Sequence, residues 1–221
     1  MDIDIAKVLG PVERSVQSFQ KDGKPAAAVV LTRLYDTTVD DLWDALTSKE
    51  RIPRWFLPVE GELKLGGKYQ LKGNAGGTIT ACTPPKHFAA TWEFGGGVTW
   101  IDVTVSTERG QARMTLEHIA ILEDHWNQFG PGAVGIGWDL GLMGLYLHLA
   151  NGGAAVKPAE VAAWSSSAAG KEFVTTSGEA WRAAHVASGE DPVSAKERSD
   201  RTIGFYRGEP PAGAAHPGSD G

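Results

Sequence analysis

The chain has 221 residues, of which 42% are hydrophobic and 22% are charged, and its formal net charge is −6. This length allows one domain with an appendage, and a core of that size needs no disulfide. The acidic balance and the lack of a Lys/Arg cluster argue against a nucleic-acid partner and against an anionic membrane surface. Cys82 is the only cysteine, so no intrachain disulfide can form.

The opening sequence, MDIDIAKVLG, contains two acids and no basic segment followed by an apolar run, which argues against an ordinary signal peptide. The apolar run at residues 140–150 is about half as long as a bilayer span requires. We therefore expect a cytoplasmic protein that does not enter a membrane.

Residues 1–25 form an N-terminal segment that is ambiguous between a short helix and a strand up to Gln20. The sequence KDGKP at residues 21–25 predicts a turn. Residues 26–35 are rich in Val, Leu and Thr, which favours a strand. A hairpin with residues 1–25 as its first arm is the simplest interpretation.

Two short helices are predicted next. Apolar residues recur at helical spacing from Val39 to Leu46, and Thr38 and Asp41 form a capping-box pattern in front of them. Thr47 and Glu50 repeat that pattern and predict the start of a second helix. This helix should reach Trp55 and stay short because of Pro53.

Residues 62–121 alternate and turn like an antiparallel meander. A two-residue turn at Arg109 and Gly110 places all the aliphatic side chains of the last hairpin on one face, whereas a slip of one residue would scatter them. The inner-face pairs in this register are Val105 with Met114, Val103 with Leu116, and Ile101 with His118. The outer-face pairs are Trp100 with Ile119 and Asp102 with Glu117.

The longest apolar segment, residues 130–150, predicts a helix that closes over a curved sheet. One stripe of this helix consists of Val134, Trp138, Leu142, Leu145 and Leu149. A second face carries Gly137, Gly141, Gly144 and His148. Glycine destabilises a helix by about 1 kcal/mol relative to alanine, so these glycines indicate either a closely approaching neighbour or unfilled space.

The segment also contains G-x-G-x-x-G at Gly130, Gly132 and Gly135. We interpret this as a chance match to a dinucleotide fingerprint, because no buried strand precedes it and no βαβ alternation surrounds it.

Beyond residue 150 we predict helices at residues 158–164, 171–188 and 191–206, the last with Asp191 as its N-cap. Together they form a C-terminal helical extension, residues 157–207, followed by a disordered tail at 208–221. The pair Trp100 and Ile119 would be an apolar patch on the outer face of the sheet. We expect either the extension, through Phe173 and Trp181, or a second subunit to cover it.

The order of strand, two short helices, meander and long helix resembles the helix-grip fold of the SRPBCC (START-like, Bet v 1-like) superfamily, an α+β fold. Five segments are similar to its AHSA-type branch, the homologues of the activator of heat-shock-protein-90 ATPase. These segments are VDDLWDALTSKERIPRWFLP (residues 39–58), LGGKYQL (65–71), CTPPKHFAATWEF (82–94), MTLEH (114–118) and GWDLGLMGL (137–145). The resemblance places the domain at residues 26–152. The chain is most similar to bacterial members of this branch. It implies a cavity for hydrophobic ligands between sheet and long helix, but fold analogy alone does not establish function.

We predict a ligand site in that cavity, and plain core packing is the alternative for each residue. The expected ligand-binding residues are Trp55, Phe56, Tyr69, Trp92, Ile101, Val103, His118, Trp138 and Leu142. An inward-facing His118 could be a satisfied core histidine, a polar anchor for a ligand, or a catalytic base. We expect no catalytic residues, no cofactor and no metal site, since no histidine pairs with Cys or carboxylates at metal-ligand spacing.

The leading hypothesis is therefore non-catalytic binding of a small hydrophobic or aromatic molecule. A cyclase-like or dehydratase-like enzyme with His118 as its base is the first alternative. A cochaperone-like interaction module is the second, and a homodimer is a candidate assembly.

Overall fold

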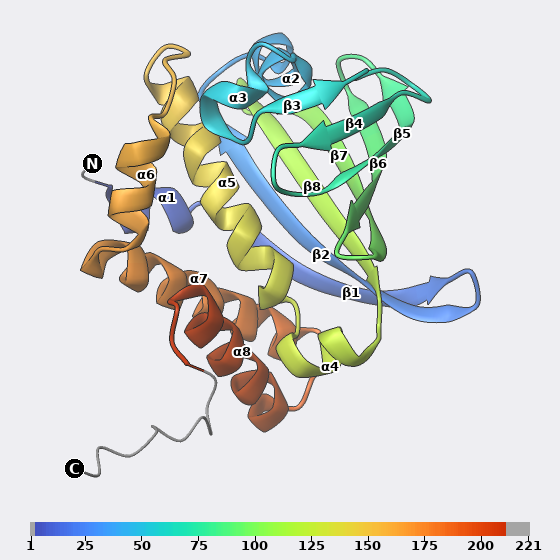
Figure 1. Ribbon diagram of the computed structural model, residues 1–221, viewed down its shortest axis with the longest axis vertical. Helices are drawn as coiled ribbons and strands as arrows, with labels where there is room; N and C mark the ends of the chain where they lie inside the picture. Colours follow the sequence, from blue (N-terminus) through green and yellow to red (C-terminus); the bar gives the residue numbers. More distant parts are fainter. Residues whose placement is uncertain (1–2, 211–221) are drawn as a thin grey trace, which may run out of the picture.

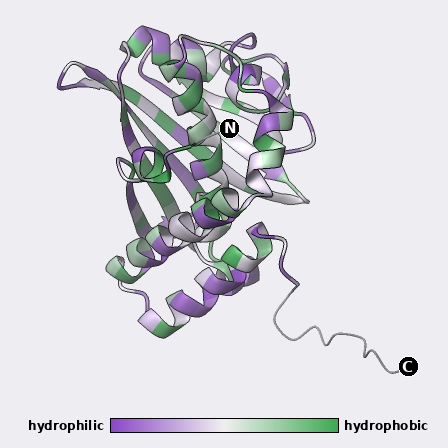
Figure 2. Ribbon diagram, turned by 90° about the vertical axis from the view of Figure 1, so that its left-hand side faces the viewer, coloured by the Kyte–Doolittle hydropathy of each residue, from purple (hydrophilic) through white to green (hydrophobic). Residues whose placement is uncertain are grey.

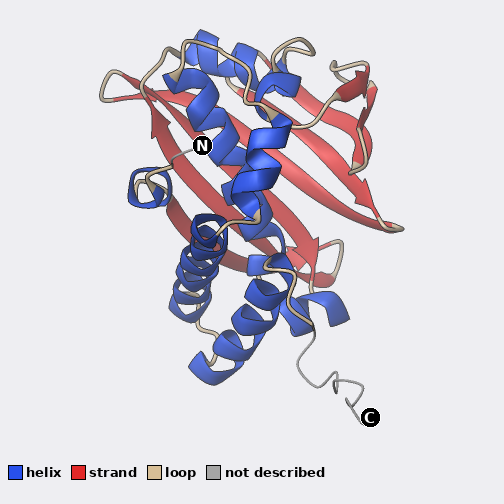
Figure 3. Ribbon diagram, turned by 60° about the vertical axis from the view of Figure 1, so that its left-hand side comes forward, coloured by secondary structure: helices blue, strands red, loops and turns tan. Residues whose placement is uncertain are grey.

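A computed structural model describes residues 3–210 of the chain. One antiparallel sheet has the strand order β1-β2-β8-β7-β6-β5-β4-β3, and helices lie against it (Figures 1 and 3). The strands are β1 (Glu13–Lys21), β2 (Lys24–Tyr35), β3 (Val59–Gly61), β4 (Lys68–Leu71), β5 (Gly76–Thr83), β6 (His87–Phe94), β7 (Gly97–Glu108) and β8 (Gln111–Ile121). The helices are α1 (Ile5–Leu9), α2 (Val39–Thr47), α3 (Ile52–Trp55), α4 (Asp124–Phe129), α5 (Gly132–Ala150), α6 (Pro158–Ser165), α7 (Ala168–Ala187) and α8 (Pro192–Tyr206). The predicted α+β class is confirmed.

The register of the β7–β8 hairpin is the predicted one. Glu108 pairs with Gln111 across a two-residue turn, and Ile101 pairs with His118. Both turn residues have positive φ, 51° at Arg109 and 81° at Gly110, the backbone that such tight turns need. One face of the hairpin therefore carries its buried aliphatic residues.

The ambiguous N-terminal segment contains both a helix and a strand. The short helix α1 precedes β1, which pairs with β2 from Glu13 opposite Thr32 to Lys21 opposite Lys24. The hairpin prediction is confirmed, with Asp22 and Gly23 as the turn. Strand β3, just before the predicted start of the meander, was not expected.

The first of the two short helices begins as predicted, because the Thr38 side chain accepts a hydrogen bond from the backbone N–H of Asp41. The predicted cap of the second helix is wrong. Arg51 holds the N-cap position of α3 without a side-chain hydrogen bond. The Thr47 hydroxyl instead donates to the Trp43 carbonyl, one turn back in α2, at 2.8 Å.

Helix α5 crosses the concave side of the sheet, and its glycines mark close neighbours. A Cβ on Gly144 would lie 2.2 Å from the Trp55 carbonyl oxygen, and one on Gly135 would lie 2.3 Å from the Trp181 ring. The glycines thus allow close packing, and the alternative of unfilled space does not apply at these two positions.

Helix α5 begins eight residues before the apolar run at residues 140–150 that argued against a membrane span. With 19 residues it is long and apolar enough to cross a membrane by length and composition alone. Within the described residues α5 is a core helix, more than half buried, that packs between the sheet and the C-terminal helices.

The C-terminal extension forms the three predicted helices. Helix α7 begins at Ala168, three residues before the expected Lys171, because Ser167 caps it through the N–H of Gly170. Asp191 caps α8 through the N–H of Ser194. Hydrophilic residues are frequent on these outer helices (Figure 2). Most of the predicted tail, residues 211–221, lies outside the described residues.

The extension does not cover the outer face of the sheet through the expected residues. Trp181 packs against α5 and donates a hydrogen bond to Asp139, and Phe173 packs against Trp164 in a separate core cluster. The Lys21 ammonium instead lies 4.3 Å above the Trp100 ring. The expectation is therefore wrong for the extension, because α7 packs on β1 and α5. Cover by a second subunit stays a prediction.

Candidate functional site: an aromatic cavity

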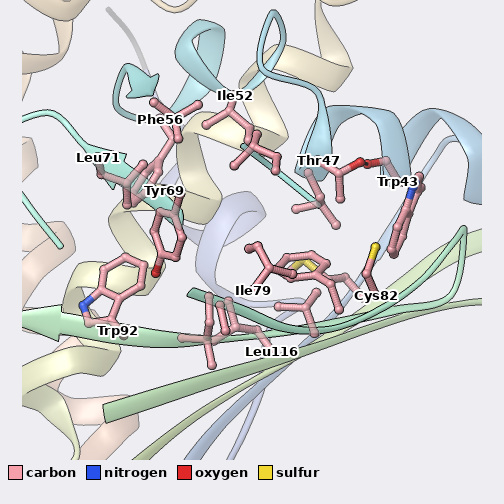
Figure 4. A pocket seen from close by; sticks show the side chains of 18 of the residues that line it. Trp43, Thr47, Ile52, Phe56, Tyr69, Leu71, Ile79, Cys82, Trp92 and Leu116 are labelled. Atoms are coloured by element: carbon pink, nitrogen blue, oxygen red, sulfur yellow. Dashed lines mark hydrogen bonds between the residues drawn. The ribbon is translucent and has the colours of Figure 1, made fainter. Parts of the chain in front are cut away.

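A cavity of about 230 Å³ lies between the inner face of the sheet and helices α2, α3 and α5 (Figure 4). Its walls are almost entirely aromatic and aliphatic. The lining residues are Trp43, Leu46, Thr47, Ile52, Trp55, Phe56, Val59, Leu63, Tyr69, Leu71, Ile79, Cys82, Pro84, Phe88, Ala90, Trp92, Ile101, Val103, Met114, Leu116, Trp138 and Leu142.

Eight of the nine residues expected at a ligand site line this cavity, and His118 does not. The eight are Trp55, Phe56, Tyr69, Trp92, Ile101, Val103, Trp138 and Leu142. They come from α3 and its C-cap residue Phe56, and from β4, β6, β7 and α5. Their role in binding a ligand stays a prediction.

Sequence reasoning missed the end of the cavity formed by α2 and the β5–β6 turn. Trp43 and Thr47 come from α2, and Cys82 and Phe88 come from β5 and β6. The alternation of Phe88, Ala90 and Trp92 along β6 could have indicated the inward face of that strand. No pattern in the sequence predicts that α2 lies at this end of the cavity.

Aromatic rings form a nearly continuous wall at the α3 and α5 side. Phe56 stacks between Trp55 and Trp138. Its ring centroid lies 5.3 Å from that of Trp55, with an interplanar angle of 27°, and 6.1 Å from that of Trp138, with an angle of 17°. Trp92 lies 5.1 Å from Trp138. At the opposite end Trp43 meets Phe88 edge to face, with ring centroids 6.0 Å apart. Such walls offer both faces and edges to a flat ligand.

The donors of Tyr69 and Trp55 in this wall are bonded within the protein. The Tyr69 hydroxyl donates to the Thr91 carbonyl at 2.7 Å, and the Trp55 indole donates to the Ala45 carbonyl at 2.9 Å. Burial raises the pKa of Tyr69, so its hydroxyl stays protonated and remains a donor. The wall therefore presents mainly carbon to the cavity.

His118 lies behind the wall and is only 2% exposed. Its Nδ1 accepts a hydrogen bond from Trp138 Nε1 at 3.0 Å, and its Nε2 lies 2.9 Å from the Thr99 hydroxyl. Thr99 in turn donates to the Trp92 carbonyl. Since indole N–H groups only donate, this chain places the His118 proton on Nε2. Burial also lowers the pKa of His118 to about 4.

His118 is thus a neutral core histidine that orients Trp138, which is the first of the three interpretations that the sequence left open. Both of its nitrogens are engaged, so neither faces a ligand in the cavity. Among residues 3–210 no group of three or more His, Cys, Asp or Glu side chains could hold a metal ion.

Lining residues at both ends of the cavity are partly open to solvent. At the α2 end Pro84 is exposed, and Thr47 and Cys82 are half-buried. At the other end Tyr69 and Trp138 are buried, and Phe56 and Trp92 are half-buried. Figure 4 shows Trp43, Thr47 and Cys82 on one side and Tyr69 and Trp92 on the other.

Comparison with known families now identifies the domain. Residues 36–148, about half of the chain, match the family described as Activator of Hsp90 ATPase homolog 1-like protein. The chain belongs to this AHSA1 family. The predicted membership in the AHSA-type branch of the SRPBCC superfamily is confirmed, and so is the helix-grip type of fold.

Among solved structures, the AHSA1 chain is similar to CalU16 from Micromonospora echinospora. The crystal structure of CalU16 has a TM-score of 0.62 and 28% identity, and covers 78% of this chain and 97% of CalU16. The solution structure of CalU16 has a TM-score of 0.64 and 26% identity, and it covers 80% of this chain and 96% of CalU16. CalU16 covers a larger share of this chain than the family match at residues 36–148 does. The similarity to CalU16 therefore includes some of the elements that flank those residues.

A third structure, protein MLL2253 from Mesorhizobium loti, shares the fold at 17% identity, with a TM-score of 0.51 and coverage of 56% of this chain and 97% of that protein. No curated protein matches the chain.

Proposed function

We propose that this AHSA1 chain binds a small hydrophobic or aromatic molecule in the cavity between its sheet and α5, without catalysing a reaction on it. The cavity itself carries the proposal. Ligand sites are typically apolar hollows with few polar groups. An apolar cavity of about 150 Å³ holds benzene, and this one is larger, at about 230 Å³.

The enzyme alternative gains no support from His118. A base must reach the proton that it removes, whereas the Nδ1 lone pair of His118 accepts from Trp138 and its Nε2 faces Thr99. The cochaperone alternative rests on the name of the family. The cytoplasmic location and the homodimer remain predictions.

The first experiment is native mass spectrometry of freshly purified protein, compared with its denatured mass. A retained small molecule at one copy per chain would support the proposal and identify the class of ligand. If the protein is bare, a panel of hydrophobic compounds should raise its melting temperature in a concentration-dependent way, because a ligand that binds only the folded state stabilises it.

Two alanines on β6 provide a matched pair of variants. Ala90 points into the cavity and is 1% exposed, whereas Ala89 points to the opposite face of the sheet. Ala90→Leu fills part of the cavity and should weaken ligand affinity at least tenfold. The ligand-induced rise in melting temperature should be smaller for the same reason. Ala89→Leu should leave that affinity unchanged. Equal binding by both variants would contradict a site in this cavity.

A further inference from the structure

We infer that Arg51 and His148 are positioning residues of the ligand site, which lie outside the cavity and hold the wall formed by α2 and α3 in place against α5. The inference rests on the proposed function and names the side chains that set the geometry of that site. Three features support it: the shortness of α3, the place of Arg51 between three helices, and the hydrogen bonds of His148.

Helix α3 supplies part of the cavity wall but is too short to hold itself. It has four residues, and Ile52, Trp55 and the C-cap residue Phe56 line the cavity. A helix of one turn is not stable on its own, so its neighbours must fix it. Figure 1 shows α3 beside the C-terminal part of α5, and the two helices are in contact. The position of this wall therefore depends on the bonds that join α3 to α2 and α5.

Arg51, the N-cap residue of α3, makes such a connection with one guanidinium group. Its Nη1 donates to the carboxylates of Asp41 and Asp44 on α2, at 2.6 and 3.2 Å. Its Nε and Nη2 donate to Nε2 of His148 on α5, at 3.3 and 3.1 Å. The Arg51 side chain is only 15% exposed. Because the guanidinium is a rigid planar fork, it fixes the start of α3 relative to both α2 and α5.

His148 is arranged to accept from Arg51. The residue is fully buried. Since a guanidinium only donates, Nε2 is the unprotonated nitrogen and Nδ1 carries the proton. Nδ1 lies 2.9 Å from the carbonyl oxygen of Ala154, which accepts from it. Ala154 lies beyond the family match, which ends at residue 148, so the segment after the domain fixes the tautomer on which the Arg51 contact depends.

Two further hydrogen bonds hold the last residues of α3. The backbone N–H of Val156 donates to the Arg54 carbonyl at 2.7 Å, and the Trp55 indole donates to the Ala45 carbonyl at 2.9 Å. A variant that lacks the Arg51 guanidinium therefore keeps α3 attached at one end. We expect such a variant to fold and to have a loosened cavity wall.

Equilibrium dialysis of the full chain with naphthalene, an uncharged aromatic probe, tests the inference. Arg51→Met keeps a long side chain and removes the guanidinium. It should weaken naphthalene binding about fivefold, because a site whose walls are not held in place binds less tightly. Arg54→Met is the matched control on the same helix. Arg54 is exposed and its Nη1 reaches the Gly153 carbonyl at 3.4 Å, so its loss should change binding less than about twofold.

Variants of His148 test the direction of the bond. His148→Phe keeps a ring but removes the acceptor, and it should weaken naphthalene binding as much as Arg51→Met does. His148→Gln supplies an amide oxygen that can accept from Arg51, so it should keep most of the affinity. Phe173→Leu, in the separate core cluster, should lower the free energy of unfolding and leave naphthalene binding unchanged. This variant separates a loss of stability from a loss of positioning.

Amide hydrogen exchange of the free protein gives a measurement that needs no ligand. The N–H of Phe56 donates to the Ile52 carbonyl at 2.9 Å and closes the single turn of α3. Its exchange should be about tenfold faster in Arg51→Met than in the natural chain, because local opening becomes easier. Arg54→Met should leave it unchanged.

The outcomes separate this inference from the proposed function. If naphthalene does not bind the natural chain, the proposed function fails and the inference fails with it. If naphthalene binds Arg51→Met as tightly as the natural chain, or if His148→Gln loses as much affinity as His148→Phe, only the inference is overturned. Unchanged exchange at Phe56 in Arg51→Met would also overturn it, whatever naphthalene does.

Discussion

The indole Nε1 of Trp138 donates a hydrogen bond to Nδ1 of His118 across 3.0 Å, and this bond joins the middle of α5 to the inner face of β8. Both side chains are buried, with exposures of 8% and 2%. The bond fixes the ring of Trp138 where it forms a wall of the cavity. It also requires a neutral imidazole, since a protonated Nδ1 could not accept it.

The stability of the protein should therefore fall as His118 becomes protonated. Burial lowers the pKa of this histidine from 6.5 to about 4 in the folded state. The unfolded chain thus binds a proton more readily, and the contribution of His118 to stability is complete above pH 6.5 and is lost as the pH falls toward about 4. The loss is on the order of 3 kcal/mol, measurable by urea unfolding across this range.

The matched variant is His118→Gln, whose amide oxygen can still accept from Trp138 but does not titrate. We expect its unfolding free energy to change less between pH 6.5 and 4 than that of the natural protein. Comparing the two chains removes the contribution of His185, whose pKa burial also lowers. Identical pH dependence of the two chains would contradict the assigned role of His118.

The close approach of α3 to α5 gives a second prediction. Gly144→Ala places a Cβ 2.2 Å from the backbone carbonyl oxygen of Trp55, which cannot move without shifting α3. Alanine favours a helix over glycine by about 1 kcal/mol, but overpacking typically costs about 1–3 kcal/mol. We expect net destabilisation in urea unfolding and a weaker ligand response, because Trp55 lines the cavity.

Gly137→Ala is the control for this prediction. Its Cβ would meet the hydroxyl end of the Tyr206 side chain at 2.9 Å, and a side-chain end can yield more readily than a backbone carbonyl. Its unfolding free energy should therefore exceed that of Gly144→Ala. The reverse order would show that the backbone contact is not the limiting one.

Local patterns were sufficient to predict much of this fold. The β7–β8 register followed from alternation and one turn, because a slip of a single residue would have placed His118 and Leu116 on the other face of the sheet. The helix starts at Thr38 and Asp191 followed from side chains that bond within three residues. Such signals depend only on nearby residues, so one sequence contains them.

The contacts that sequence reasoning missed join residues far apart in the chain. Arg14 and Asp139 are 125 residues apart, yet their side chains form a buried ion pair. Thr47 of α2 and Cys82 of β5 line the same end of the cavity because α2 packs on the sheet, against β7 and β8. His118 was correctly placed on the inner face, but its partner Trp138 depends on the rotation of α5. No periodic pattern in the sequence predicts these long-range contacts.

The buried carboxylate of Asp139 gives the last prediction. It accepts two hydrogen bonds from Arg14, at 2.8 and 3.2 Å, and further bonds from Ser177 and Trp181 of α7. The side chains of Arg14 and Asp139 are 7% and 0% exposed. Removing the charge of Asp139 leaves the Arg14 guanidinium buried without its counter-ion, so Asp139→Asn should lower the unfolding free energy by about 3–5 kcal/mol.

The same substitution at an exposed ion pair is the control. Asp200 pairs with Lys196 at 2.5 Å on α8, and their side chains are 53% and 61% exposed. Because solvent screens such pairs, Asp200→Asn should change stability by no more than about 1 kcal/mol. Urea unfolding of both variants measures the difference. Comparable losses at the two sites would mean that the buried pair does not hold α5, β1 and the C-terminal extension together.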